Sequence, residues 1–138
     1  MLADTLPAFA VEITLTLPLT QIQPMQSTIT INVTLDPDKL PEKIEWQASA
    51  STADAGQAAK AMLLSLWDGA DKSALRIDLW TKDMMVDEMG DFFYQTLSAM
   101  ADTYQRATGQ GEIVADMRRF AQEFYQKFRK LQLKDQKA

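Results

Sequence analysis

The chain has no cysteine and no histidine among its 138 residues. Without cysteine it cannot form a disulfide, a thiol nucleophile or a thiolate metal site. Without histidine it lacks the most common general base and the most common metal ligand of proteins. These absences exclude catalytic triads built on histidine, cysteine–histidine pairs and nearly every zinc site. Composition therefore argues against most classes of enzyme.

The chain also has no basic residue before Lys39 and no long apolar run. A secretory signal needs a basic start and an unbroken apolar core, whereas Pro7, Glu12 and several threonines interrupt the N-terminal segment. No window approaches the roughly 18 apolar residues of a membrane-spanning helix. We therefore expect a soluble, cytoplasmic protein.

What is present is typical of one folded domain, with 46% apolar and 24% charged residues. The net charge of −5 disfavours nucleic acid as the main partner, because phosphate binding usually needs a broad basic face. The bases gather near the C-terminus, at Arg118, Arg119, Lys127, Arg129, Lys130, Lys134 and Lys137. Such a tail could approach an anionic membrane, but helix C-termini favour cations in any case, and we expect no membrane contact.

Alternating apolar residues predict strands over Thr28–Leu35 and Ile44–Ala48, joined as a hairpin by the turn-forming DPDKLPEK. The segment Gln57–Trp67 (QAAKAMLLSLW) is rich in Ala, Leu and Met and predicts a short helix that Gly69 would end. Alternation returns at Leu75–Trp80, which predicts a third strand.

Two amphipathic helices are predicted at the end of the chain. Apolar residues recur at helical spacing in two sets, Met85, Met89, Phe92, Phe93, Leu97, Met100 and Tyr104, then Ile113, Met117, Phe120, Phe124, Phe128 and Leu131. Gly109 would stop the first helix. Methionines at this spacing suit an adaptable binding groove, but beside phenylalanines they are more often core.

The expected fold is α+β, an antiparallel sheet of three to four strands covered on one face by three helices, in the order (β)ββαβαα. The bracketed strand is Val11–Leu17 (VEITLTL), a candidate extra edge strand. We expect residues 1–25 to be an N-terminal extension, residues 26–133 a single domain and residues 134–138 a polar tail.

The third strand has an unusual second side. Leu75, Ile77 and Leu79 alternate with Arg76, Asp78 and Trp80. Because Arg and Trp often anchor protein interfaces, we predict an interaction surface made of Arg76, Asp78, Trp80, Lys82 and Met84. The alternative is that the two charges pair with neighbouring strands, that Trp80 covers a sheet edge, and that Thr81 or Asp83 caps the next helix.

The remaining acidic residues give no metal or catalytic prediction. Asp87 and Asp91 stand one helical turn apart and could share a cation, but a helix N-terminus favours acids without any ligand. Asp36 and Asp38 resemble the start of a calcium loop, yet the required glycine is missing and Pro41 intrudes. An enzyme working with two carboxylates alone would need them to face each other across a cleft, which no spacing here requires.

Four segments of the chain resemble the gliding motility protein GldC family of Bacteroidota. They are LPEKIEWQAS, KAMLLSLWD, LRIDLWTKDMMVDEMGDFFYQTLSAMADTYQRATG and DMRRFAQEF. The likeness runs from about Thr28 to about Phe128, and family members begin near the position of Met25. The resemblance implies a small cytoplasmic protein that supports surface gliding and its cell-envelope machinery. It brings no established catalytic residue, cofactor or ligand.

We therefore expect a non-enzymatic accessory protein that acts through protein–protein interaction, with no cofactor and no metal. Its partners would be proteins of the gliding or cell-envelope machinery. A homodimer is also possible on this sequence, through Trp80 or through an edge strand at Val11–Leu17. The alternative function is a holdase, similar to an export chaperone, that binds unfolded protein segments.

Overall fold

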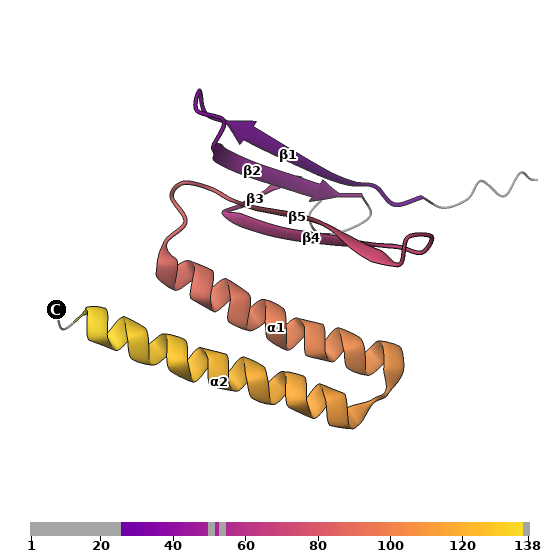
Figure 1. Cartoon of the computed structure of the whole chain (residues 1–138). Coiled ribbons are helices and arrows are strands. Elements are labelled where there is room, and N and C mark those ends of the chain that lie inside the picture. The colour runs from indigo at the N-terminus through magenta and orange to yellow at the C-terminus, as the bar shows by residue number, and fades with distance from the viewer. Residues whose placement is uncertain (1–25, 50–51, 53–54, 137–138) are drawn as a thin grey trace, which may run out of the picture.

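The strands and helices form successive layers in the computed structural model, which describes residues 26–49, 52 and 55–136. In chain order the elements are β1 (Ile29–Leu35), β2 (Pro41–Ala48), β3 (Gln57–Ala59), β4 (Ala61–Asp68), β5 (Ser73–Trp80), α1 (Val86–Thr108) and α2 (Gly111–Asp135). α1 lies against the layer of strands, and α2 packs on the side of α1 away from them (Figure 1). The α+β class is thus confirmed, whereas the candidate strand Val11–Leu17 lies outside the described residues.

The strands make two antiparallel sheets instead of the single sheet expected from the sequence. The first has the order β1-β2-β3, with Ile31 opposite Trp46 and Val33 opposite Ile44. The second is the hairpin of β4 and β5, in which Ala61 lies opposite Trp80. Because β3 and β4 are separated by a single residue, the chain passes directly from one sheet into the other.

The predicted helix over Gln57–Trp67 is wrong, because this segment forms β3 and β4 and leaves two helices instead of three. Ala, Leu and Met favour a helix by less than about 1 kcal/mol each over ordinary residues. That local preference is outweighed by pairing with β5 along the whole of β4. Asp68 Oδ1 accepts the backbone N–H groups of Ala70 and Asp71 at 2.8 and 3.0 Å, so Gly69 lies in a strand turn and ends no helix.

Both ends of α1 are defined by local hydrogen bonds. The Glu88 carboxylate accepts the backbone N–H of Met85, the residue preceding the helix, at 3.0 Å. The expected caps Thr81 and Asp83 are therefore wrong, because both lie in the loop before Met85. At the other end Gly109 has the left-handed φ of 66°, as predicted for a helix stop, and α2 begins two residues later.

The two helices approach closely because small residues line their contact. Ala101 of α1 and Val114 and Ala121 of α2 are fully buried. The ring of Phe128 in α2 lies directly over Gly90 of α1. It fills the space that a side chain at position 90 would occupy. The helical pair is therefore a tight antiparallel hairpin.

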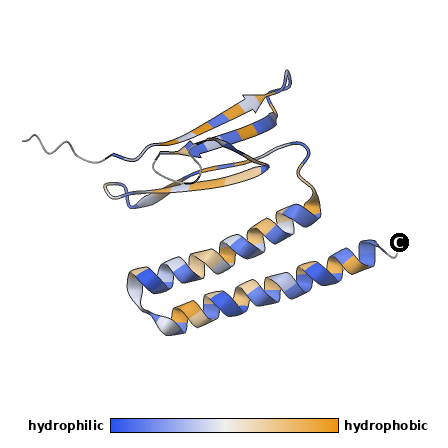
Figure 2. Cartoon of the chain, turned by 180° about the vertical axis from the view of Figure 1, so that it is seen from behind, coloured by the Kyte–Doolittle hydropathy of each residue, from blue (hydrophilic) through white to orange (hydrophobic). Residues whose placement is uncertain are grey.

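The core between the strands and α1 is small. Ile44 is only 1% exposed, and beside it a hollow of about 300 Å³ lies between the strands and Phe92 of α1. Within the described residues, only four hydrophobic side chains are fully buried. Apolar segments recur along the strands and along both helices (Figure 2), so much apolar surface stays uncovered.

Candidate interaction surface

Trp80 stands at the end of β5 beside a shallow hollow. Its side chain is 57% exposed. The hollow measures about 310 Å³ and is lined by Leu40, Pro41, Asp78, Leu79, Trp80 and Lys82. Apolar walls with a few charged groups at the margin are the usual composition of a binding site for a side chain or small ligand.

Lys82 is held at the rim of this hollow by two carboxylates. Its Nζ lies 3.3 Å from Glu42 Oε1 and 3.3 Å from Asp36 Oδ2. These contacts raise the pKa of Lys82, and the contact with Glu42 has the largest effect. The ammonium therefore stays charged. Its backbone N–H also donates to the carbonyl of Pro41 at 3.1 Å, which ties the end of β5 to the start of β2.

Asp36 organises the turn that brings Leu40 to the same hollow. Its Oδ1 accepts the backbone N–H groups of Leu40 and Asp38 at 3.0 and 2.9 Å. The hydrogen bond from Leu40, then those from Lys82 and Asp38, lower the pKa of Asp36. The turn also uses a left-handed residue, Lys39, at φ 64°. Leu40 is thereby held exposed beside Trp80.

The two charges of β5 pair with each other. Arg76 Nη2 lies 3.1 Å from Asp78 Oδ1 on the same face of the strand, and both side chains are about half exposed. The expected pairing of these residues with neighbouring strands is therefore wrong, because each finds its opposite charge two residues away. Their mutual neutralisation leaves Trp80 and Trp67, at opposite ends of the hairpin, as the large exposed apolar residues of this face.

The five residues of the predicted surface divide into three groups. Asp78, Trp80 and Lys82 line the hollow, and Arg76 joins them through Asp78. Met84 lies in the loop between β5 and α1, is half-buried, and is not one of the lining residues. The sequence reasoning missed Leu40 and Pro41, although the turn-forming DPDKLPEK contains both, with Leu40 exposed and Pro41 half-buried.

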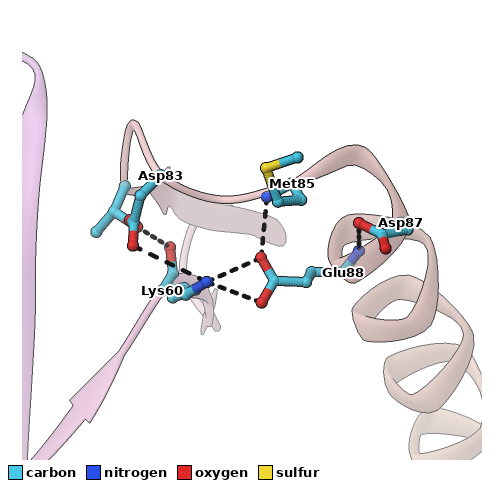
Figure 3. Close-up of polar contacts among 6 residues, drawn as sticks. Lys60, Asp83, Met85, Asp87 and Glu88 are labelled. Carbon is cyan, nitrogen blue, oxygen red and sulfur yellow. Dashed lines mark hydrogen bonds and ion pairs between the residues drawn. The ribbon is translucent and has the colours of Figure 1, made fainter.

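A second polar cluster joins the sheets to α1 (Figure 3). Lys60, the residue between β3 and β4, contacts both carboxylate oxygens of Glu88 at 2.8 and 3.0 Å. The salt bridge raises the pKa of Lys60 and, together with the Met85 N–H, lowers the pKa of Glu88. The Thr81 backbone N–H donates to the Lys60 carbonyl at 2.7 Å, and the Thr81 hydroxyl donates to Asp83 Oδ1 at 2.5 Å, which lowers the pKa of Asp83. These groups satisfy one another, so we assign the cluster a structural role.

The opposite face of the β4–β5 hairpin is also open. Met62, Leu64 and Leu66 of β4 lie across from Leu79, Ile77 and Leu75 of β5, and we call these six residues the aliphatic face. Leu75 and Ile77 are 57% and 53% exposed, and Leu66 is likewise exposed. Contiguous apolar surface of this kind marks interaction sites on soluble proteins. The consecutive apolar residues of AMLLSLW were the available signal, since they place apolar side chains on both sides of a strand.

The charged groups of the described residues do not assemble a metal site. No cluster of three or more acidic ligands lies within this part of the chain. The carboxylates whose pKa shifts, Asp36, Asp68, Asp83 and Glu88, all shift downward, so they stay ionised near neutral pH. Neither helix of the described part is long and apolar enough to cross a membrane.

The sequence of the chain matches one known protein family. The sequence model described as "Gliding motility-associated protein GldC-like" matches residues 41–130, about two thirds of the chain. The chain belongs to the GldC-like family. The matched region begins at the start of β2 and ends within α2, so it includes the lining of the Trp80 hollow except Leu40, the aliphatic face and most of the helical hairpin. The chain matches no curated protein and no solved structure.

Proposed function

We propose that this GldC-like protein is a non-enzymatic accessory protein of the cytoplasm that binds another protein through its β4–β5 hairpin. The observation that carries the proposal is that the hairpin exposes large apolar side chains on both faces, Trp80 on one and Leu75 and Ile77 on the other. An isolated two-stranded hairpin is at best marginally stable in water, so surface of this kind favours a covering partner. Membership of the family points to the gliding machinery as the source of that partner.

The Trp80 hollow supports a specific contact within that interface. An exposed tryptophan with polar groups at its margin matches the usual arrangement of an interface hot spot. Lys82 is fixed in place by Glu42 and Asp36, so it requires little further ordering when a partner binds. We expect the partner to insert an apolar side chain beside Trp80 and to place a polar or acidic group near Lys82.

The test is crosslinking and pull-down of the tagged full chain from its native cells, with Trp80→Ala in parallel. Loss of a hot-spot tryptophan costs about 2 kcal/mol or more, which is roughly a 30-fold loss of affinity. The matched control is Trp67→Ala, because Trp67 is also an exposed tryptophan on the same face, at the other end of the hairpin. If Trp80→Ala still captures the same partner, the proposed site is refuted. If Trp80→Ala loses the partner and also has a lower melting temperature, Trp80 is a core residue.

A second candidate function is a holdase for unfolded protein segments. Uncovered apolar surface on several separate elements favours it, because unfolded clients present apolar side chains in no fixed order. This function predicts that the protein suppresses aggregation of unrelated unfolded clients at near-stoichiometric ratios. A pull-down that yields many unfolded or nascent chains, and no single dominant partner, would favour the holdase over the accessory protein.

A further inference from the structure

The hairpin of α1 and α2 has one apolar face that no other element of the described residues covers. On α2, the residues turned toward α1 are Val114, Ala121 and Phe128. A second apolar row lies about a quarter-turn away and consists of Ile113, Met117, Phe120, Phe124 and Leu131, which we call the outer stripe. Phe120 and Leu131 of this stripe are 58% and 60% exposed, and Ile113 is also exposed.

α1 extends the same apolar face. A hollow of about 480 Å³ has α1 residues on one side, among them the exposed Met100, and Met117 of the outer stripe on the other. The opposite face of the hairpin is polar, because Arg118 there pairs with Asp102 at 2.9 Å and Gln122 donates to the Tyr94 hydroxyl at 2.8 Å. The two helices are thus amphipathic as a unit, beyond what their mutual contact requires.

We propose that a second copy of this chain covers this face, with the two α2 helices antiparallel across a two-fold axis near residue 122. A two-fold interface requires a surface that is complementary to itself. The outer stripe has this property at four of its five positions, because reversing the helix exchanges these four apolar residues in pairs. In this register Phe120 meets Phe124 of the second copy, and Ile113 meets its Leu131. Lys127 then lies over Met117 of the second copy, with its alkyl stem on the apolar surface and its ammonium toward water.

The charges beside the stripe fit the antiparallel register. Asp116 flanks the stripe near its N-terminal end and Lys130 near its C-terminal end, so each comes close to the other across the axis. Asp116 is already bound by Arg119 of its own helix at 2.6 Å, whereas Lys130 has no ion-pair partner within the described residues. Glu123 lies near the axis, with Lys127 one turn away on the same helix to balance its charge.

The extent of the face favours a second hairpin over a single incoming helix. Helices of 23 and 25 residues are about 35 Å long, and two helices side by side are about 20 Å wide. The face therefore measures on the order of 700 Å², close to the ~800 Å² that each partner buries in a standard interface. A lone helix would cover about half of it. Two hairpins together would form a four-helix bundle.

The first measurement is the mass of the full chain by sedimentation velocity or light scattering at micromolar concentration. We expect about 31 kDa, twice the 15.5 kDa of one chain, and the mass of one chain for Phe120→Glu. Gln126→Glu adds the same charge on the polar side of α2 and should remain a dimer. A wild-type chain that stays monomeric overturns the proposal, as does a Phe120→Glu chain that stays dimeric.

The register is tested by crosslinking, which has no background because the natural chain lacks cysteine. Oxidation of a mixture of Phe120→Cys and Phe124→Cys chains should join the two kinds of chain, since a disulfide needs Cα atoms within about 7 Å. Gln126→Cys should not crosslink. Preferential joining of Phe120→Cys chains to each other would overturn the antiparallel arrangement. This assay needs no destabilising charge, so it decides the matter even if Phe120→Glu fails to fold, and Trp80→Ala should leave the dimer intact.

Discussion

Replacing Gly90 by alanine tests the closeness of the two helices. In an exposed helix interior, Gly→Ala stabilises a protein by about 1 kcal/mol, because alanine loses less backbone entropy on folding. In this protein the added methyl group would fall on the ring of Phe128, which must move out toward the uncovered face. Overpacking of this kind costs about 1–3 kcal/mol. We expect a net destabilisation of about 1 kcal/mol, and at most about 2.

The assay is urea or thermal unfolding followed by circular dichroism, at one protein concentration for all variants. The expected loss lowers the melting temperature by roughly 3–10 °C. Gly111→Ala is the matched control, because no atom lies near the position of its added methyl group. Phe128→Leu combined with Gly90→Ala should recover part of the loss and reveal coupling between the two sites. Stabilisation by Gly90→Ala alone would refute the close contact, since it is the result expected of an unobstructed glycine.

Three further predictions concern stability. The contact between Glu88 and Lys60 lowers the pKa of Glu88 and raises that of Lys60, so it stabilises the folded state at neutral pH. This contribution to the free energy of unfolding is lost as pH falls below about 4.5, and it is lost again as pH rises above about 10.5. Glu88→Gln should therefore lower the urea midpoint at pH 7 more than at pH 3, and an equal effect at both would contradict this account. Ile44→Ala should cost about 2–5 kcal/mol in urea unfolding, because Ile44 is fully buried, while a cost below 1 kcal/mol would mean that the strands and α1 do not pack as described. Asp68→Ala should cost about 1–2 kcal/mol by removing two turn hydrogen bonds, whereas Asp71→Ala, which removes no such side-chain acceptor, should change little in the same assay.

The sequence was sufficient to predict those elements whose structure is decided by interactions between residues close together in the chain. Strands β1, β2 and β5 follow from alternation, and α1 and α2 from helical spacing, with Gly109 ending α1 as predicted. The segment QAAKAMLLSLW was misassigned because its composition suits a helix as well as a strand. The interaction that decides between them is pairing with β5, which no local pattern contains.

The candidate site shows the same division. The sequence drew attention to Trp80 through its place on a strand, but the neighbours of Lys82 come from β2 and from the turn before it, far along the chain. Alternation also identified Leu75 and Ile77 as the apolar side of β5. It could not reveal whether any element covers that side, because covering depends on the arrangement of all the layers.

The order of the elements has a consequence for how the chain acquires its structure. The strands that bury Ile44 come first, and α1, whose Phe92 borders the same core, comes after all of them. During synthesis the strands therefore leave the ribosome before the helix that completes their core. The helical hairpin, in contrast, depends on contacts close in sequence around Gly109 and can form quickly once its residues are available. The core around Ile44 can therefore be completed only after α1 has left the ribosome.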